Sequence, residues 1–139
     1  MNVVLCLFFC NSMMAQNSDI PWTPQQMIAP EMLAGIIKGG NTNNMLIISV
    51  GPSGLIKNAV DNGPVRDKEG VDRLKKLLSA EKKDRAIIVY CGCCPYKNCP
   101  NIRPAYAVLK ELKFTNFKLL NLPQNLKSDW IDKGYPMSN

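Results

Sequence analysis

The chain contains no histidine among its 139 residues. This absence excludes Ser-His-Asp and Cys-His hydrolases, histidine-ligated zinc and any histidine general base. A nucleophile in this protein must therefore be activated by helix dipoles, cations or neighbouring thiols. Nucleic-acid motifs are also lacking, and aromatic residues do not alternate with basic ones, so we expect no nucleic-acid partner. The net charge of +6 indicates either a mild attraction for anions or, as the simpler interpretation, a contribution to solubility alone.

Apolar runs long enough to span a membrane are lacking as well. The run over residues 3–9 is too short to cross a bilayer, and Ala15 is a small residue where a signal peptidase could cut. We therefore predict a secretory signal peptide over residues 1–15, although no Lys or Arg precedes the run. An uncleaved anchor or a buried strand is the alternative. The prediction implies an exported protein, periplasmic or extracellular, whose mature form has no contact with the membrane.

Cysteine, by contrast, is concentrated in one place. Four of the six cysteines fall within nine residues, namely Cys91, Cys93, Cys94 and Cys99. They follow a strand-like apolar run, residues 86–90, and precede a helix-like segment. The carboxyl end of a strand is where open α/β sheets bind ligands, and a nearby helix N-terminus favours a thiolate. Because Cys91 is the first residue after the strand, we predict that it is the reactive and solvent-accessible thiol.

Strand-like and helix-like segments alternate along the chain, which predicts an α/β fold with a five-stranded, mainly parallel sheet and helices on both faces. Four of the strands are located, at residues 26–28, 45–50, 86–90 and 117–120. The helices are expected at 30–38, 68–80 and 102–112, the last capped by Asn101. Residues 51–63, rich in Gly, Pro and Asn, indicate loop and turn. The start of that segment lacks the Gly-Lys-Ser/Thr ending of a phosphate loop, and we expect it to turn the backbone beside the cysteines.

Four stretches, in their order and spacing, resemble the rhodanese-like domain, the fold of the thiosulfate sulfurtransferases. They are residues 28–33 (IAPEML), 46–59 (LIISVG followed by GLIKNA), 87–91 (IIVYC) and 129–136 (DWIDKGYP). The resemblance covers nearly the whole chain after the predicted signal peptide. It implies a single rhodanese-like domain over residues 16–139.

The resemblance also implies a reaction. Cys91 would take a sulfane sulfur as a persulfide from a small anionic donor or a protein thiol, and would pass it to cyanide or another thiol. The substrate-binding loop would comprise Gly92, Cys93, Cys94, Pro95, Tyr96, Lys97, Asn98, Cys99 and Arg103. Its amides would hold the persulfide, and Lys97 or Arg103 would supply positive charge. We expect no cofactor and no metal for this reaction.

The cysteine loop departs from the family pattern, in which the catalytic cysteine opens a tight loop with a basic residue near its end. Here eleven residues separate Cys91 from Arg103, so the loop is expected to be expanded. The Asp and Arg usual at the end of the second strand are Ser49 and Gly51. A phosphatase with a Cys-x5-Arg cradle is excluded, because Lys97 takes the place of the arginine.

Other uses of the four cysteines stay open. The C-x-x-C of residues 91–94 suits thiol-disulfide or peroxide chemistry, in which a neighbour resolves an attacked Cys91. Four thiolates without histidine suit zinc or Cu(I), although their spacing differs from paired C-x2-C zinc hooks. A structural disulfide between Cys94 and Cys99 would suit an oxidising compartment, would leave Cys91 free and is compatible with sulfur transfer.

Overall fold

The computed structural model describes residues 19–139. The predicted signal peptide, residues 1–15, lies outside this range. Within it, every helix is too short or too polar to cross a bilayer.

The described residues form one sheet of five strands in the order β1-β5-β4-β2-β3, with every neighbouring pair parallel. The strands are β1 (Met27–Ile28), β2 (Met45–Ser49), β3 (Ala59–Asp61), β4 (Ala86–Tyr90) and β5 (Phe117–Leu120). The predicted α/β sheet is confirmed, and it is wholly rather than mainly parallel. β4 lies between β5 and β2 and is buried after its first residue, which explains its unbroken apolar sequence.

Strand β3 lies within the segment that the sequence assigned to loop and turn, so that prediction is wrong for Ala59–Asp61. The strand pairs with β2 through Ala59 opposite Ile47, and it forms one edge of the sheet. Val60 and Asp61 are exposed. A three-residue edge strand with little burial carries too short an apolar pattern to be distinguished from a turn.

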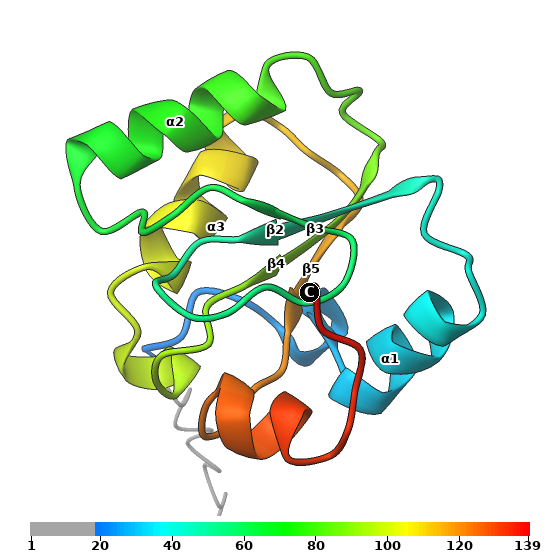
Figure 1. Cartoon of the computed structure of the whole chain (residues 1–139). Coiled ribbons are helices and arrows are strands. Elements are labelled where there is room, and N and C mark those ends of the chain that lie inside the picture. Colours follow the sequence, from blue (N-terminus) through cyan, green and yellow to red (C-terminus); the bar gives the residue numbers. More distant parts are fainter. Residues whose placement is uncertain (1–18) are drawn as a thin grey trace, which may run out of the picture.

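Helices cover both faces of the sheet (Figure 1). Helices α2 (Lys68–Leu78) and α3 (Ile102–Glu111) pack together on one face, while α1 (Pro30–Lys38) lies on the other. Helix α1 has the bounds that the sequence predicted. Helices α2 and α3 begin where predicted and end within two residues of the predicted end. Short helical turns complete the chain at η1 (Pro24–Gln26), η2 (Tyr96–Asn98) and η3 (Lys127–Ile131).

The C-terminal segment returns to the carboxyl edge of the sheet. Trp130 is fully buried, packs edge-on against Tyr135 with 5.2 Å between ring centroids, and donates its indole N–H to the Pro136 carbonyl at 3.0 Å. Just beyond, Met137 forms an antiparallel bridge with Ile56. The tail is thereby fixed against the segment that follows β2.

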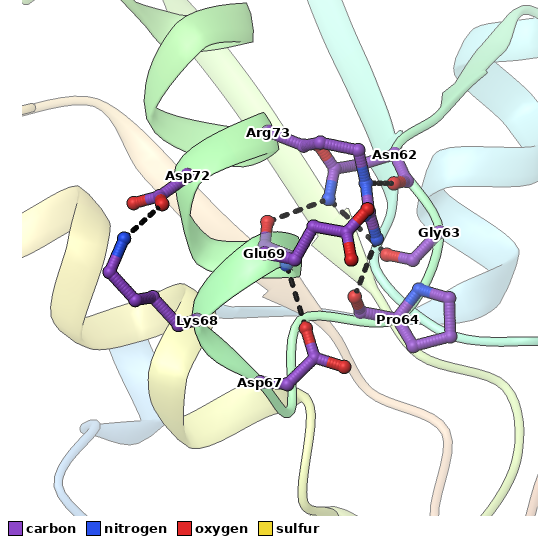
Figure 2. Close-up of polar contacts among 9 residues, drawn as sticks. Asn62, Gly63, Pro64, Asp67, Lys68, Glu69, Asp72 and Arg73 are labelled. Carbon is purple, nitrogen blue, oxygen red and sulfur yellow. Dashed lines mark hydrogen bonds and ion pairs between the residues drawn. The ribbon is translucent and has the colours of Figure 1, made fainter.

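Polar contacts fix the connection between β3 and α2 (Figure 2). The carboxylate of Asp67 caps the first turn of α2 by accepting a backbone N–H at 2.8 Å. From the next turn, Arg73 donates to the backbone carbonyls of Asn62 and Pro64, each at 3.2 Å. These contacts hold the backbone on either side of Val65, which takes part in the site described next.

Candidate active site

The four cysteines after β4 converge at the carboxyl edge of the sheet. The Sγ atom of Cys93 lies 3.3 Å from that of Cys91 and 3.1 Å from that of Cys94. The Sγ atoms of Cys91, Cys93 and Cys99 all lie within 4.8 Å of one another. The loop therefore folds back until its last cysteine meets its first. We call these four side chains the thiol cluster.

All four thiols of the cluster are free. The Cys94–Cys99 disulfide, one of the alternatives that the sequence left open, is absent from the described residues, and the sulfur of Cys94 contacts that of Cys93.

Cys91 is buried, with an exposed fraction of 0%. The prediction that it is solvent-accessible is wrong, because the turn after β2 covers it. A Cβ atom added at Gly51 would collide with the Cys91 sulfur, so the two segments are in direct contact. Cys93, which is exposed, is the neighbour that connects Cys91 with solvent.

The turn after β2 lies beside the cysteines, as the sequence predicted. The hydroxyl of Tyr90 holds it by accepting the N–H of Ile56 at 2.9 Å and donating to the carbonyl of Gly54 at 3.1 Å. On the other side, the carbonyl of Gly92 accepts the N–H of Leu126 at 2.9 Å. A Cβ at Gly92 would collide with Leu126, so only glycine fits this close approach.

The two buried thiols of the cluster have opposite pKa shifts. A hydrogen bond from Cys91, supported by the backbone N–H groups of Asn101 and Ile102, lowers the pKa of Cys99 to about 5 against the opposing effect of burial. The same hydrogen bond to Cys99, followed by burial, raises the pKa of Cys91. The thiol of Cys99 therefore ionises more readily than the thiol of Cys91.

This result corrects the prediction that the helix N-terminus favours a Cys91 thiolate. The residue whose sulfur meets the first amides of α3 is Cys99. Cys91 lies at the strand end of the loop, whereas Cys99 lies at the helix end. Burial, the largest influence on Cys94, raises the pKa of that thiol to about 12.

Asn101 belongs to the site, although the sequence indicated only a helix cap. It occupies the residue before α3, but its side chain makes no capping hydrogen bond. Instead its Nδ2 donates to the Cys91 sulfur at 3.5 Å, and its Oδ1 accepts the backbone N–H of Val65 at 3.0 Å. Asn101 therefore ties the segment before α2 to the thiol cluster. Its place two residues after Cys99 was the signal that could have identified it.

The middle of the loop forms the short turn η2. Tyr96 is buried and packs edge-on against Trp22, with 6.1 Å between ring centroids. Its hydroxyl has no hydrogen-bond partner within residues 19–139, and burial raises its pKa. The remaining residues of the turn region are exposed: Pro95, Lys97 and Asn98. The loop is thus anchored by one aromatic side chain.

Arg103 braces the loop from α3. Its guanidinium lies 5.9 Å from the centroid of Trp22, and its terminal nitrogen donates to the Lys97 carbonyl at 3.4 Å. No hydrogen bond joins Arg103 or Lys97 to a thiol in the part of the chain that the structure describes. Their role in holding an anionic donor stays a prediction.

A hollow of about 420 Å³ opens beside the exposed member of the cluster. It is lined by Ser53, Gly54, Gly92, Cys93, Asn125, Leu126, Lys127 and Ile131. Its polar groups come from three separate segments of the chain. The hollow therefore offers a small molecule a place next to Cys93.

No family model and no curated protein matches the chain. Several solved structures do resemble it. The Alr3790 protein from Anabaena sp. matches with a TM-score of 0.58 and 18% identity, over 81% of this chain and 91% of that one. The As-Sb reductase from Leishmania major matches with a TM-score of 0.53 and 19% identity, over 78% of each chain.

A third match is a variant of EanB, described as a cysteine persulfide in a tetrahedral intermediate state with ergothioneine. Its TM-score is 0.57 and its identity 18%, over 81% of this chain and 28% of that one. This chain therefore corresponds to little more than a quarter of EanB. Together with the all-parallel sheet, these likenesses show that the described residues have a rhodanese-like α/β fold.

Proposed function

We propose that this protein is a rhodanese-like sulfurtransferase or persulfide carrier that works at the thiol cluster. The observation that carries the proposal is the convergence of four free thiols at the carboxyl edge of a rhodanese-like sheet. Open α/β sheets bind their ligands at this edge. The persulfide in EanB supports the proposal, because part of that protein shares the fold.

Cys91 is the nucleophile in this proposal. Its sulfur attacks the outer sulfur of a donor such as thiosulfate; the new S–S bond forms as the donor's S–S bond breaks, and sulfite leaves with the bonding electron pair. Cyanide or an acceptor thiolate then attacks the outer sulfur of the persulfide, and Cys91 departs as a thiolate. Sulfur passes from donor to acceptor, and the protein needs no separate oxidant or reductant.

The sulfur of Cys99 lies within 4.8 Å of the Cys91 sulfur, and the pKa of Cys99 is lowered to about 5. At rest Cys99 is too weak a base to take the proton of Cys91, whose pKa is raised. The proton therefore moves towards the Cys99 sulfur only as the new S–S bond forms and sulfite departs. A nucleophile next to a base that is itself held by a third group is the general pattern of covalent catalysis. Asn101, 3.5 Å from the Cys91 sulfur, stabilises the thiolate that forms.

The donor in this proposal is a small anion or a protein thiol, which approaches from the hollow beside Cys93. Because Cys91 is buried, the exposed side chain of Cys93 must move aside for the donor to reach the Cys91 sulfur. The N-terminus of α3 and the exposed Lys97 both favour an anion.

We also propose that the protein acts after export. Native protein should then begin near Ala15 or Gln16, and recovery of intact residues 1–9 from the exported fraction by mass spectrometry would contradict this.

Replacement of Cys91 tests the proposal. Cys91→Ser should abolish both persulfide formation and cyanide-dependent release of thiocyanate. Cys94→Ser is the matched control, since it removes a cluster thiol that has no direct hydrogen bond to Cys91, and it should retain both. Persulfide on Cys93 or Cys99 of the Cys91→Ser protein would reassign the nucleophile. A wild type that forms no persulfide but cycles a disulfide with a partner would replace sulfur transfer by redox chemistry.

A further inference from the structure

We propose that the thiol cluster also binds one thiophilic cation, Cu(I), through the sulfur atoms of Cys91, Cys93 and Cys99. The inference goes beyond sulfur transfer and stands on geometry. These three sulfur atoms come from the end of β4, the loop and the residues before α3, and they lie within 4.8 Å of one another. A single ion can therefore contact all three.

The spacing of the sulfur atoms suits a trigonal site. With metal–sulfur bonds of about 2.3 Å, three sulfur atoms around one ion lie about 4 Å apart. The Cys91–Cys93 separation of 3.3 Å and the upper limit of 4.8 Å for the set fall on either side of this value. Small side-chain movements are enough to bring the three ligands to bonding distance.

The composition of the cluster selects the ion. The sequence has no histidine, and within residues 19–139 no carboxylate joins the three thiols. Thiolate ligands select soft ions such as Cu(I) and Zn²⁺. Structural zinc is held by four protein ligands, whereas a three-sulfur set satisfies Cu(I) without a fourth. Cys94 lies outside the set, although it adjoins Cys93 in the sequence.

Two of the three ligands are buried, and the third is exposed to solvent. Cys91 and Cys99 are buried, and each adjoins a regular element or its first turn, while Cys93 is exposed. Fixed ligands lower the cost of assembling a site, and an exposed one lets the hydrated ion enter. Each coordinating thiol that still carries a proton releases it to solvent on binding. Because Cys91 is a shared ligand, bound Cu(I) blocks sulfur transfer.

Competition with a chromogenic Cu(I) chelator tests the site. The fully reduced chain, titrated without oxygen, should retain one equivalent of Cu(I). Cys93→Ser should weaken the affinity by more than about a hundredfold, beyond what loss of a supporting contact alone causes. The neighbouring substitution Cys94→Ser should leave the affinity unchanged. Circular dichroism shows whether both variants keep the fold, which is expected because neither side chain is fully buried.

X-ray absorption should then find three sulfur neighbours around copper in the wild type and in Cys94→Ser. The site would be overturned if Cys93→Ser and Cys94→Ser lost the same Cu(I) affinity, or if X-ray absorption found only two sulfur neighbours. It would also be overturned if the wild type retained no copper against the chelator. Tighter binding of Zn²⁺ through all four cysteines would overturn the choice of ion. These results are independent of sulfur transfer, since Cu(I) binding is measured without a sulfur donor and thiocyanate release without copper.

Discussion

Cys91 and Cys99 occupy opposite ends of one loop, and their surroundings shift their pKa values in opposite directions. Cys91 follows a central strand, lies under the turn after β2 and has a raised pKa. Cys99 precedes α3, receives its first amides and has a pKa lowered to about 5. The end of β4 therefore determines where the Cys91 sulfur lies, and the start of α3 favours the charged form of Cys99. In a chain without histidine, two thiols can in this way divide the work of nucleophile and base.

The largest expected effect comes from removing the base. Cys99→Ser should lower the rate of sulfur transfer by about a hundredfold or more, which is the contribution typical of a positioned base. Cys94→Ser again serves as the control. Single-turnover persulfide formation measures the step directly. A Cys99→Ser protein as fast as the wild type would mean that Cys91 is activated without its neighbour.

The pH dependence of stability separates the two ends of the loop. The folded pKa of Cys99, about 5, lies below its ordinary value of 9.0, so its stabilising contribution is complete above pH 9 and is lost as the pH falls through 5. The pKa of Cys91 is raised, so this group destabilises the folded state once the pH exceeds its ordinary value of 9.0.

Denaturant unfolding of wild type and Cys99→Ser from pH 5 to pH 9 measures this contribution. The difference in unfolding free energy between the two proteins should grow as the pH rises. A difference that is constant over this range would show that Cys99 is not the thiolate of the folded state.

A substitution at Gly51 tests whether the turn after β2 packs directly on Cys91. Gly51→Ala places a methyl group against the Cys91 sulfur. We expect a loss of about 1–3 kcal/mol in unfolding free energy, with a fall in sulfur transfer. Gly35→Ala is the control, because a Cβ there has no neighbour within 4 Å and lies in α1, where alanine should stabilise by roughly 1 kcal/mol. Normal stability and activity of Gly51→Ala would contradict the close contact.

Asn101 links both ends of the loop, and two variants separate its roles. Asn101→Ala leaves the buried N–H of Val65 without an acceptor, which should cost roughly 1–2 kcal/mol of stability. Asn101→Asp keeps that acceptor but loses the donor to Cys91. Denaturation and single-turnover kinetics should therefore find a folded but slower Asn101→Asp protein. Equal activity in Asn101→Asp and the wild type would limit Asn101 to a structural role.

The smallest effect is expected at the edge of the loop. Arg103→Ala removes a cation–π contact with Trp22 and a long hydrogen bond to the Lys97 carbonyl. Partly exposed contacts of this kind contribute about 0.5–1 kcal/mol. Thermal unfolding should show a small loss, and Arg103→Lys should recover little of it because the planar group is lost. If Arg103→Ala lost much more activity with an anionic donor than with a neutral one, Arg103 would have to contact the donor directly.

The sequence predicted what local patterns determine and missed what depends on distant contacts. Strand β4 is an unbroken apolar run and α1 begins at a proline and ends before two glycines, so both had the expected bounds. The burial of Cys91 depends on how the turn at Gly51 packs across it. The role of Asn101 depends on Val65, 36 positions away.

The thiolate was assigned to the wrong end of the loop for a related reason. The pattern of strand, cysteine and helix indicates that a thiol meets the helix N-terminus. Which thiol does so is decided by the conformation of residues 92–98, which brings Cys99 to the first amides of α3 while Cys91 stays at the strand end. No periodicity in the sequence encodes that conformation.

Mapping the persulfide by mass spectrometry tests the central claim most directly. The reduced protein is incubated with thiosulfate, alkylated rapidly and digested, and the extra sulfur is located among the four cysteines. We predict one added sulfur atom, on Cys91, in the wild type and in Cys94→Ser, and none in Cys91→Ser. Sulfur on Cys93, Cys94 or Cys99 in place of Cys91, or no added sulfur with any donor, would contradict the account.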